Sequence, residues 1–394
     1  MPPPLLQARR RGAPKPRVVF PLIAQWHQAL HSLPIAAALS RRGDYEVHVA
    51  APGATLARAK TLMAALGGRG VVFHNLWTSS FLRENPPKAL MLAAAATWLT
   101  DFAAVVAPER TSLMLKRFGV TRPLFIHSDH GAGDRAVGYE PRIRRFDGVL
   151  LAGAKQEARM LRAGLIIPGR YAIVGYPKFE AAAASRQAGP PLFRNPRPTV
   201  LYNPHFRADL SSWPAFGATV LEGFAAQDRY NLIFAPHVRM AAERAEELKA
   251  VAARYAGAAN IHVDLGGPRC CDMTYTDMAD AYLGDVSSQV YEFIRAPRPC
   301  LFLNASGVDR AGDENYAHWA LGPVATTAEG ITAAVDRARA SHGDYRRVQA
   351  AAFRETFDLG ERPCSERAAD AVEAMMRDGA VVARPLGELS PTAD

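Results

Sequence analysis

The sequence lacks the short motifs that mark several large enzyme classes. No GxGxxG follows the first expected strand, where the segment from Pro21 to His27 stands instead, and this disfavours a dinucleotide cofactor. There is also no Walker A loop and no HExxH pair. Asp277-Met-Ala-Asp280 has the wrong spacing for an acidic Asp-x-Asp metal motif. Neither a cofactor nor an obligatory metal ion is therefore implied.

Cysteine is scarce, and no long apolar run is present. The four cysteines lack CxxC spacing and two of them are adjacent, so we expect reduced thiols in a cytosolic protein: Cys270, Cys271, Cys300 and Cys364. Residues 89–106 are apolar, but Thr97, Thr100 and Asp101 interrupt them short of the ~18 to 20 residues of a membrane span. This segment predicts a buried helix that runs into a short strand, with a monotopic membrane-surface patch as the alternative.

Charge is unevenly distributed along the 394 residues. The chain has 47 Lys and Arg against 38 Asp and Glu, a net charge of +9, and 49% hydrophobic residues, which excludes a disordered protein. Five of the positive charges lie in the first 17 residues, which have no acid and no apolar core of a signal peptide: Arg9, Arg10, Arg11, Lys15 and Arg17. The mildly charged body gives no footprint for nucleic acid. The basic tail can contact anionic lipid or phosphate.

Short β-branched runs alternate with Ala-rich amphipathic stretches. Strands are expected at 18–24, 46–50, 71–74, 103–106, 124–127 and 149–151, and then at 199–202, 231–235, 260–263, 281–284 and 300–303. Helical spacing occurs between and after them, at 56–66, 156–163, 216–226, 241–255, 331–340 and 367–376. Such alternation is typical of an α/β protein in which helices cover both faces of a parallel sheet.

Residues 181–198 divide this pattern. They are rich in Ala, Pro, Gly and Arg without apolar periodicity, which predicts a linker. The sequence therefore predicts two Rossmann-like, doubly wound domains, at 17–180 and 199–378, between a basic disordered tail at 1–16 and a flexible tail at 379–394. Two such sheets place a central cleft between their carboxyl ends, where ligands of these folds bind.

The first candidate site follows the strand at 124–127. His130 stands at the expected carboxyl end of the first sheet, where a histidine can take a proton from a hydroxyl near neutral pH. Gly131, Gly133 and Gly138 let the backbone approach a ligand closely and expose N–H groups to an anion. The alternative is a glycine turn with a solvated histidine.

Three more polar clusters follow strands of the second domain. They are Tyr202-Asn203-Pro204-His205-Phe206-Arg207, Pro236-His237-Val238-Arg239 and Gly284-Asp285-Val286-Ser287-Ser288. The two serines suit an N-cap, which would explain at least one of them. A helix N-terminus with two hydroxyls close to a histidine and an arginine is also a phosphate site.

The ordered set resembles the CDP-glycerol glycerophosphotransferases, the teichoic-acid primases and polymerases of GT-B fold. His130-Gly131-x3-Arg135-x2-Gly138 is similar to a family motif that has lysine at the arginine position. Gly175-Tyr-Pro177-Lys178, Leu201-Tyr202-Asn-Pro204-His205-Phe-Arg207, His237 and the segment 284–293 match later motifs loosely, over about half of the chain. By contrast, His27-Gln28-Ala-Leu-His31-Ser32-Leu-Pro34 resembles the first loop and helix of nucleotide-sugar epimerases.

The resemblance implies transfer of a polyol phosphate from a CDP-linked donor to an acceptor hydroxyl in cell-envelope glycopolymer synthesis. It implies His130 as the base, with Asp134 or Asp129 orienting it, and His237 as a further catalytic candidate. The remaining candidates bind the donor, and Asp285 among them lies either near its polyol or among the hydrogen bonds that support the site: Gly131, Arg135, Arg207, Arg239, Asp285, Ser287 and Ser288. The acceptor would be lipid-linked or a glycan, and the basic tail would let a cytoplasmic enzyme attach to the inner face of the membrane.

Three other functions remain open. A GT-B glycosyltransferase would keep the pyrophosphate clamp and move a sugar. A UDP-sugar 2-epimerase would need acids and a histidine around the sugar, for which Asp129, Glu140 and His237 are available. A catalytically degenerate binding subunit would keep the fold without the chemistry.

Overall fold

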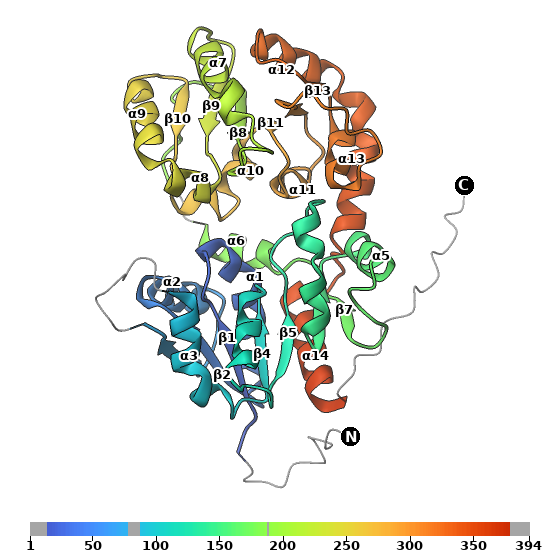
Figure 1. Cartoon of the computed structure of the whole chain (residues 1–394). Coiled ribbons are helices and arrows are strands. Elements are labelled where there is room, and N and C mark those ends of the chain that lie inside the picture. The colour runs from blue at the N-terminus through green and yellow to red at the C-terminus, as the bar shows by residue number, and fades with distance from the viewer. Residues whose placement is uncertain (1–13, 78–86, 187–188, 379–394) are drawn as a thin grey trace. The chain divides into compact units, whose positions relative to one another are not determined.

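The computed structural model describes residues 14–77, 87–186 and 189–378. The chain forms two compact units (Figure 1). Among the described residues, the first unit takes those up to His130, then Tyr139–Ser185 and those from Phe357 onward, and the second takes Gly131–Gly138 and Arg186–Thr356. Most of the basic tail expected at 1–16, and the flexible tail expected at 379–394, lie outside the described residues.

The first unit contains a seven-stranded parallel sheet in the order β3-β2-β1-β4-β5-β6-β7. Its strands are β1 Arg17–Pro21, β2 Glu46–Ala51, β3 Val72–Asn75, β4 Ala104–Ala107, β5 Leu124–His127, β6 Gly148–Leu151 and β7 Tyr171–Ile173. Its helices are α1 Trp26–Arg42, α2 Gly53–Ala65, α3 Lys88–Leu99, α4 Met114–Arg117, α5 Ala154–Arg162, α6 Lys178–Ser185 and α14 Cys364–Asp378, with the 3₁₀ turns η1 Thr111–Leu113, η2 Ala136–Tyr139 and η3 Pro141–Arg145.

The second unit contains a six-stranded parallel sheet in the order β10-β9-β8-β11-β12-β13. Its strands are β8 Thr199–Asn203, β9 Asn231–Phe234, β10 Ile261–Val263, β11 Ala281–Gly284, β12 Cys300–Leu303 and β13 Val324–Ala325. Its helices are α7 Trp213–Ala225, α8 Val238–Glu243, α9 Ala245–Tyr255, α10 Thr274–Met278, α11 Gln289–Phe293, α12 Ile331–Ala340 and α13 His342–Thr356, with η4 Pro268–Cys270 and η5 Glu314–Leu321.

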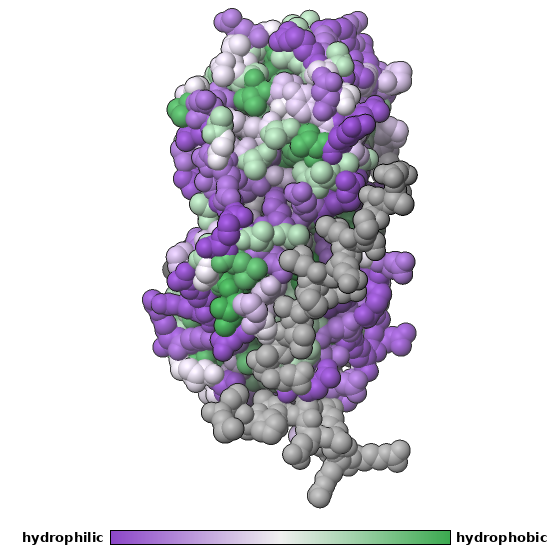
Figure 2. All heavy atoms as spheres, turned by 90° about the vertical axis from the view of Figure 1, so that its right-hand side faces the viewer, coloured by the Kyte–Doolittle hydropathy of each residue, from purple (hydrophilic) through white to green (hydrophobic). Residues whose placement is uncertain are grey.

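Each unit has its own hydrophobic core, as helices on both faces of a parallel sheet require. In the first, Val19, Val105 and Phe125 of three neighbouring strands pack with apolar side chains of α3. In the second, Tyr202 and Phe234 pack with apolar side chains of α7 and α12. Hydrophilic side chains cover most of the face shown in Figure 2. The predicted fold class, α/β with two doubly wound parallel sheets, is confirmed, whereas the central cleft stays a prediction.

The stretch expected to be a linker begins as a helix. Residues 181–185 belong to α6, which starts directly after Pro177. Alanine is the best helix former and needs no apolar periodicity in a short helix, which is why the Ala-rich composition was misleading. Two further strands, β7 and β13, and the long helix α13 were not predicted at all.

The chain crosses between the units more often than the predicted ranges allow. The segment from Phe357 onward packs in the first unit, where Arg42 of α1 forms ion pairs with three acids of α14: Glu366, Asp370 and Glu373. Gly175 is left-handed (φ 84°), and a Cβ there would overlap Cys364 and the carbonyl of Asp358, so this approach requires glycine. Gly131–Gly138 packs in the second unit.

The apolar stretch at 89–106 forms α3 and β4, as predicted. Met91, Leu92 and Leu99 are buried in the first core, while Leu90 is 56% exposed. Among the described residues, no helix has both the length and the apolarity needed to cross a bilayer. All four cysteines are free thiols.

Candidate functional site

The strand order of the second sheet reverses between the neighbouring strands β8 and β11. From β8 the chain continues to β9 and β10 on one side, and from β11 to β12 and β13 on the other. Loops that leave such a pair of strands diverge, and ligands of open α/β sheets bind at this point beyond the carboxyl ends. The loops after β8, β9 and β11 hold most of the predicted binding residues: His205, Arg207, His237, Arg239, Asp285, Ser287 and Ser288.

Arg135 belongs to the same unit through the segment Gly131–Gly138. Its Nη1 lies 2.8 Å from Nε2 of His205. No carboxylate of the described residues forms an ion pair with its half-buried guanidinium. Burial, followed by the charges of Arg207 and Arg239, lowers the pKa of Arg135. A buried cation without a carboxylate partner is costly, so it favours the arrival of an anion.

His205 is surrounded by hydrogen-bond donors. Besides Arg135 at Nε2, the backbone N–H of Arg207 lies 3.1 Å from Nδ1. Burial and the charge of Arg135 lower the pKa of His205 to about 2, so the ring is neutral near pH 7. A neutral imidazole carries one N–H, and that N–H must face one of the two donors. The contact with Arg135 is therefore a weak one, and the guanidinium is ready to turn toward phosphate.

Arg207 and Arg239 have carboxylate partners that are weakly held. Nη2 of Arg207 lies 2.7 Å from Asp209, and Nη2 of Arg239 lies 3.3 Å from Glu243, with all four side chains about half exposed. Exposed ion pairs contribute only ~0 to 1 kcal/mol, so a multivalent phosphate can replace these acids. The guanidinium of Arg239 also stacks on Phe206, 4.0 Å from the ring centre, which fixes its plane.

His237 offers a neutral N–H donor. The backbone N–H of Arg239 donates to its Nδ1 at 3.1 Å, so its proton is carried on Nε2. Burial, then the charges of Arg135 and Arg239, lower the pKa of His237 to about 4. The ring therefore can donate a hydrogen bond to an anion near pH 7 but contributes no positive charge.

Asp285 lies beneath these loops and is fully buried. Its Oδ2 accepts hydrogen bonds from the backbone N–H groups of His205 (2.9 Å) and Ser212 (2.8 Å), and its Oδ1 has no partner. This geometry holds the loop after β8 against β11. Asp285 thus supports His205 through the backbone, which is the second of the two roles expected for it.

Replacing Asp285 by asparagine should change how stability depends on pH. Burial raises the pKa of Asp285 to about 7, above the ~3.9 of an unfolded chain. Between these values the folded protein holds a proton that the unfolded chain releases, so the unfolding free energy falls as pH rises. The difference in unfolding free energy between Asp285→Asn and the parent should therefore shift in favour of the variant by up to about 4 kcal/mol from about pH 4 to about pH 8. Urea unfolding at both pH values measures this, and an equal difference at both would contradict it.

Ser287 and Ser288 lie at the start of α11. Ser287 Oγ accepts from the backbone N–H of Gln289 at 3.2 Å, whereas Ser288, the N-cap residue, forms no capping hydrogen bond through its side chain. Since α11 is only five residues long, its dipole adds little to anion binding. The predicted role of the two serines depends on their hydroxyls. Gly133 packs on this turn, and a Cβ there would lie 2.9 Å from that of Ser288, which explains the need for glycine.

His130 lies in the first unit and is firmly oriented. Its Nδ1 is hydrogen-bonded to the carbonyl of Pro108, which can only accept, so the proton sits on Nδ1. Nε2 lies 3.1 Å from the amide nitrogen of Gln28 and keeps its lone pair, which is the form a general base needs. The side chain of His130 is only 23% exposed, so it is not the solvated histidine of a glycine turn that the sequence left as the alternative.

The carboxylate beside His130 is Asp129. Its Oδ1 accepts from the backbone N–H of His130 at 2.7 Å, and Gln156 donates to its Oδ2 at 3.1 Å. Asp129 has φ 41°, a left-handed conformation that is strained for a residue with a side chain. Asp134 instead has its carboxylate in the second unit, hydrogen-bonded to Tyr291 and His318. Of the two predicted orienting acids, the geometry favours Asp129.

Similarity to known proteins is confined to structure. No family model matches the chain, and no curated protein matches it by sequence. A protein of Listeria monocytogenes assigned as a UDP-N-acetylglucosamine 2-epimerase has a TM-score of 0.61 at 13% identity, over 93% of this chain and 97% of that one. The wall teichoic acid polymerase TagF has a TM-score of 0.58 at 13% identity, over 92% of this chain and 89% of that one.

A third similar structure is the UDP-GlcNAc 2-epimerase of Neisseria meningitidis bound to UDP-GlcNAc. It has a TM-score of 0.58 at 14% identity, over 92% of this chain and all of that one. These similarities cover nearly the whole chain, so this protein has the GT-B fold that the sequence predicted. At such identities they establish the fold alone.

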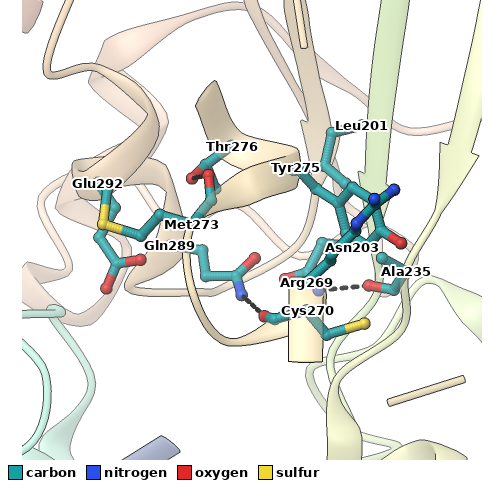
Figure 3. A pocket seen from close by; sticks show the side chains of 10 residues that line it. All are labelled: Leu201, Asn203, Ala235, Arg269, Cys270, Met273, Tyr275, Thr276, Gln289 and Glu292. Carbon is teal, nitrogen blue, oxygen red and sulfur yellow. Dashed lines mark hydrogen bonds between the residues drawn. The ribbon is translucent and has the colours of Figure 1, made fainter. Parts of the chain in front are cut away.

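A small pocket lies at the carboxyl edge of the second sheet, where β8 and β9 end. Figure 3 shows the strand residues Leu201, Asn203 and Ala235 on one side of it and Met273 and Glu292 on the other. The rest of its lining comes from η4, α10 and α11: Arg269, Cys270, Tyr275, Thr276 and Gln289. Its roughly 260 Å³ of space between atoms includes open solvent, and the enclosed part has room for about one water molecule, too little for a nucleobase.

Several residues of this region were not found from the sequence. Met273 is left-handed (φ 66°) and buried at the pocket, and like Asp129 it marks a place where strain is tolerated. Gln28 and Tyr291 stand in segments that resemble family motifs, but neither of them was assigned a role from the sequence. His318 carries no motif, and only its spatial neighbours reveal it. Among the described residues, no three His, Cys, Asp or Glu side chains are grouped to bind a metal ion.

Proposed function

We propose that the protein transfers a polyol phosphate, such as glycerophosphate, from a CDP-activated donor to an acceptor hydroxyl in cell-envelope glycopolymer synthesis. The observation that carries this proposal is Arg135, a half-buried cation resting on a neutral histidine, with Arg207 and Arg239 close enough to lower its pKa. Three guanidinium groups at the switch point of a sheet suit a pyrophosphate.

The residues divide the work of the proposed reaction. The arginines of the second unit neutralise the pyrophosphate, and His237 donates its Nε2–H to it. His130 Nε2 accepts the proton of the acceptor hydroxyl as the oxygen attacks the distal phosphorus. The bond from that phosphorus to the bridging oxygen breaks, and CMP leaves with the electron pair. Charge stabilisation and in-line positioning supply most of the rate enhancement in such transfers.

This mechanism requires His130 and the arginines to meet at one substrate. Their meeting depends on the central cleft that the sequence predicts, which is part of this proposal. TagF, whose structures include crystals soaked with CDPG, is one of the proteins that share this fold. That likeness and the motif resemblance support a CDP-linked donor.

A second candidate is conversion of a UDP-sugar, as an epimerase or a glycosyltransferase. The similarity to the two epimerases is as extensive as that to TagF, which favours keeping this alternative. Its acids are less available here. Glu140 pairs with Arg142 and Arg110, and Asp129 holds the backbone of His130. A chain that binds nucleotide but forms no product would instead be a binding subunit.

A nucleotide screen separates these candidates. A ligand that binds only the folded state increases the free energy of unfolding, by about 2.7 kcal/mol when its concentration is a hundred times Kd. The melting temperature rises as a result. We expect CDP to raise it more than UDP, GDP or ADP. CDP-glycerol, CDP-ribitol and UDP-sugars are then incubated with acceptor and the products identified by mass spectrometry. If UDP raises the melting temperature more than CDP does, and a UDP-sugar is converted, the second candidate function is favoured.

A lipid-linked acceptor predicts attachment to membranes without a spanning helix. The basic residues Arg9, Arg10 and Arg11 lie outside the described residues, and α3 presents Leu90 to solvent. Each basic residue near an anionic surface contributes about 1 kcal/mol, screened by salt. The protein should therefore sediment with anionic liposomes at low salt and dissociate at high salt. Equal binding to neutral liposomes, or none to either, would remove the idea.

A further inference from the structure

Asp134 sits next to Arg135 in the sequence but does not neutralise it. Its carboxylate is 3% exposed and accepts from Tyr291 Oη at 2.9 and 2.8 Å, one contact to each oxygen. Oδ2 also accepts from the backbone N–H and the ring Nδ1 of His318, both at 3.0 Å. We call these three residues the Asp134 clasp. These three residues all belong to the second unit.

The clasp joins two loops of the second sheet to the segment Gly131–Gly138. Tyr291 belongs to α11, which follows β11, and His318 belongs to η5, which follows β12. The same segment touches the start of α11 again through Gly133, which packs on Ser288. These anchors account for an eight-residue segment packing with the second unit although the chain on both sides of it belongs to the first.

We infer that Asp134 is a positioning residue whose buried clasp aims Arg135 at the anion. Its carboxylate accepts from Tyr291 and His318 and forms no ion pair with the neighbouring guanidinium. Asp134 is held by Tyr291 and His318, whereas Arg135 contacts His205 and is influenced by the charges of Arg207 and Arg239. The inference rests on the proposed function only in taking the anion to be the donor's pyrophosphate.

An anchored loop matters because of the entropy of a long side chain. An arginine on a free segment would lose backbone and side-chain freedom on binding, which weakens affinity. The clasp removes that freedom in advance. Changing Asp134 should therefore weaken anion binding through Arg135, and should have no further effect once Arg135 is gone. A purely structural role predicts independent effects that multiply.

The test measures binding of inorganic pyrophosphate and of CDP to the full chain by calorimetry, with thermal unfolding recorded for each variant. Asp134→Asn keeps the shape but turns an amide toward three donors. We expect it to lower pyrophosphate affinity by at least about tenfold, since charge-assisted hydrogen bonds are lost. In the Arg135→Ala background the same change should have less than about a twofold effect.

Two further variants keep the test decisive. Glu109→Gln removes an equally buried carboxylate that holds backbone N–H groups in the first unit, and it should leave pyrophosphate binding unchanged. If Asp134→Asn does not fold, Tyr291→Phe removes two of the contacts and should show a smaller loss with the same dependence on Arg135. The inference would be overturned if Asp134→Asn bound pyrophosphate as tightly as the parent does. It would also be overturned if the losses of affinity from Asp134→Asn and Arg135→Ala multiplied in the double variant.

The two probes separate this inference from the proposed function. Pyrophosphate binding that depends on Asp134, together with no preference for CDP over other nucleotides, would support the clasp and refute the CDP-linked donor. CDP binding that is unaffected in Asp134→Asn would refute the clasp alone. A parent chain that binds neither probe would refute both.

Discussion

Replacing His130 by alanine should lower turnover by about 10²- to 10⁴-fold and leave nucleotide affinity unchanged. The reason is that His130 belongs to the first unit, whereas the proposed nucleotide site belongs to the second. Its Nε2 is the basic nitrogen, because Nδ1 is committed to the carbonyl of Pro108. Loss of the ring removes the base for the acceptor proton and no contact to the donor.

The measurement combines donor titration by calorimetry with transfer rates at saturating CDP-linked donor. The parent rate should fall at acid pH, where an imidazole takes up a proton and stops acting as a base, and the variant should lack this limb. His74→Ala is the matched control, since His74 lies on the edge strand β3 and contacts His48. Its turnover should equal that of the parent.

Two results would remove His130 from this role. A His130→Ala protein that folds, binds donor and transfers at the parent rate would leave His205 or His237 as the candidate base. Both are poor bases, because burial and nearby arginines lower their pKa values to about 2 and about 4. A variant that loses stability while its pH profile keeps its shape would instead mean that His130 only packs the glycine turn.

The sequence predicted the sheets because burial dictates strand composition. A strand of a parallel sheet is covered on both faces, so it becomes a short continuous apolar run, as at β5 and β11, whose bounds match the prediction. Helices that lack such a constraint were harder to find. α13 has only three buried side chains among 15 residues, so its sequence shows too little apolar periodicity for a helix to be recognised.

The candidate site was predictable only in part, and for a related reason. Polar residues after strands can be placed at one edge of a sheet from sequence, which located Arg207, Arg239 and Asp285. Their partners come from distant segments. Arg135 meets His205 across 70 residues and Asp134 meets His318 across 184, and nothing in the local sequence of either residue encodes such a pair. Only the folded chain distinguishes Asp129 from Asp134 as the neighbour of His130.

Replacing Arg135 by alanine should lower affinity for CDP and for pyrophosphate by about 10- to 100-fold, because hydrogen bonds between charged groups contribute ~1.5 to 3 kcal/mol. Arg135 should have the largest effect of the three arginines, since no carboxylate in the described part of the chain forms an ion pair with it, whereas Arg207 and Arg239 already pair with Asp209 and Glu243.

The neutral donors should contribute less than Arg135. His237→Ala and the double change of Ser287 and Ser288 to alanine should each lower nucleotide affinity by up to about tenfold, because they lose donors to a charged phosphate. Raising the salt concentration should weaken binding in these variants as it does in the parent, because the arginines remain.

Arg135→Lys distinguishes geometry from charge. Lysine keeps the positive charge but lacks the planar fork that binds two phosphate oxygens, so we expect it to recover only part of the affinity. Arg254→Ala is the control, an exposed arginine of the same unit that pairs with Glu222 on a helix surface, and it should bind CDP like the parent. Equal CDP and pyrophosphate affinity in the parent and in Arg135→Ala would place the anion away from this cluster, and the assignment of Arg207 and Arg239 would fall with it.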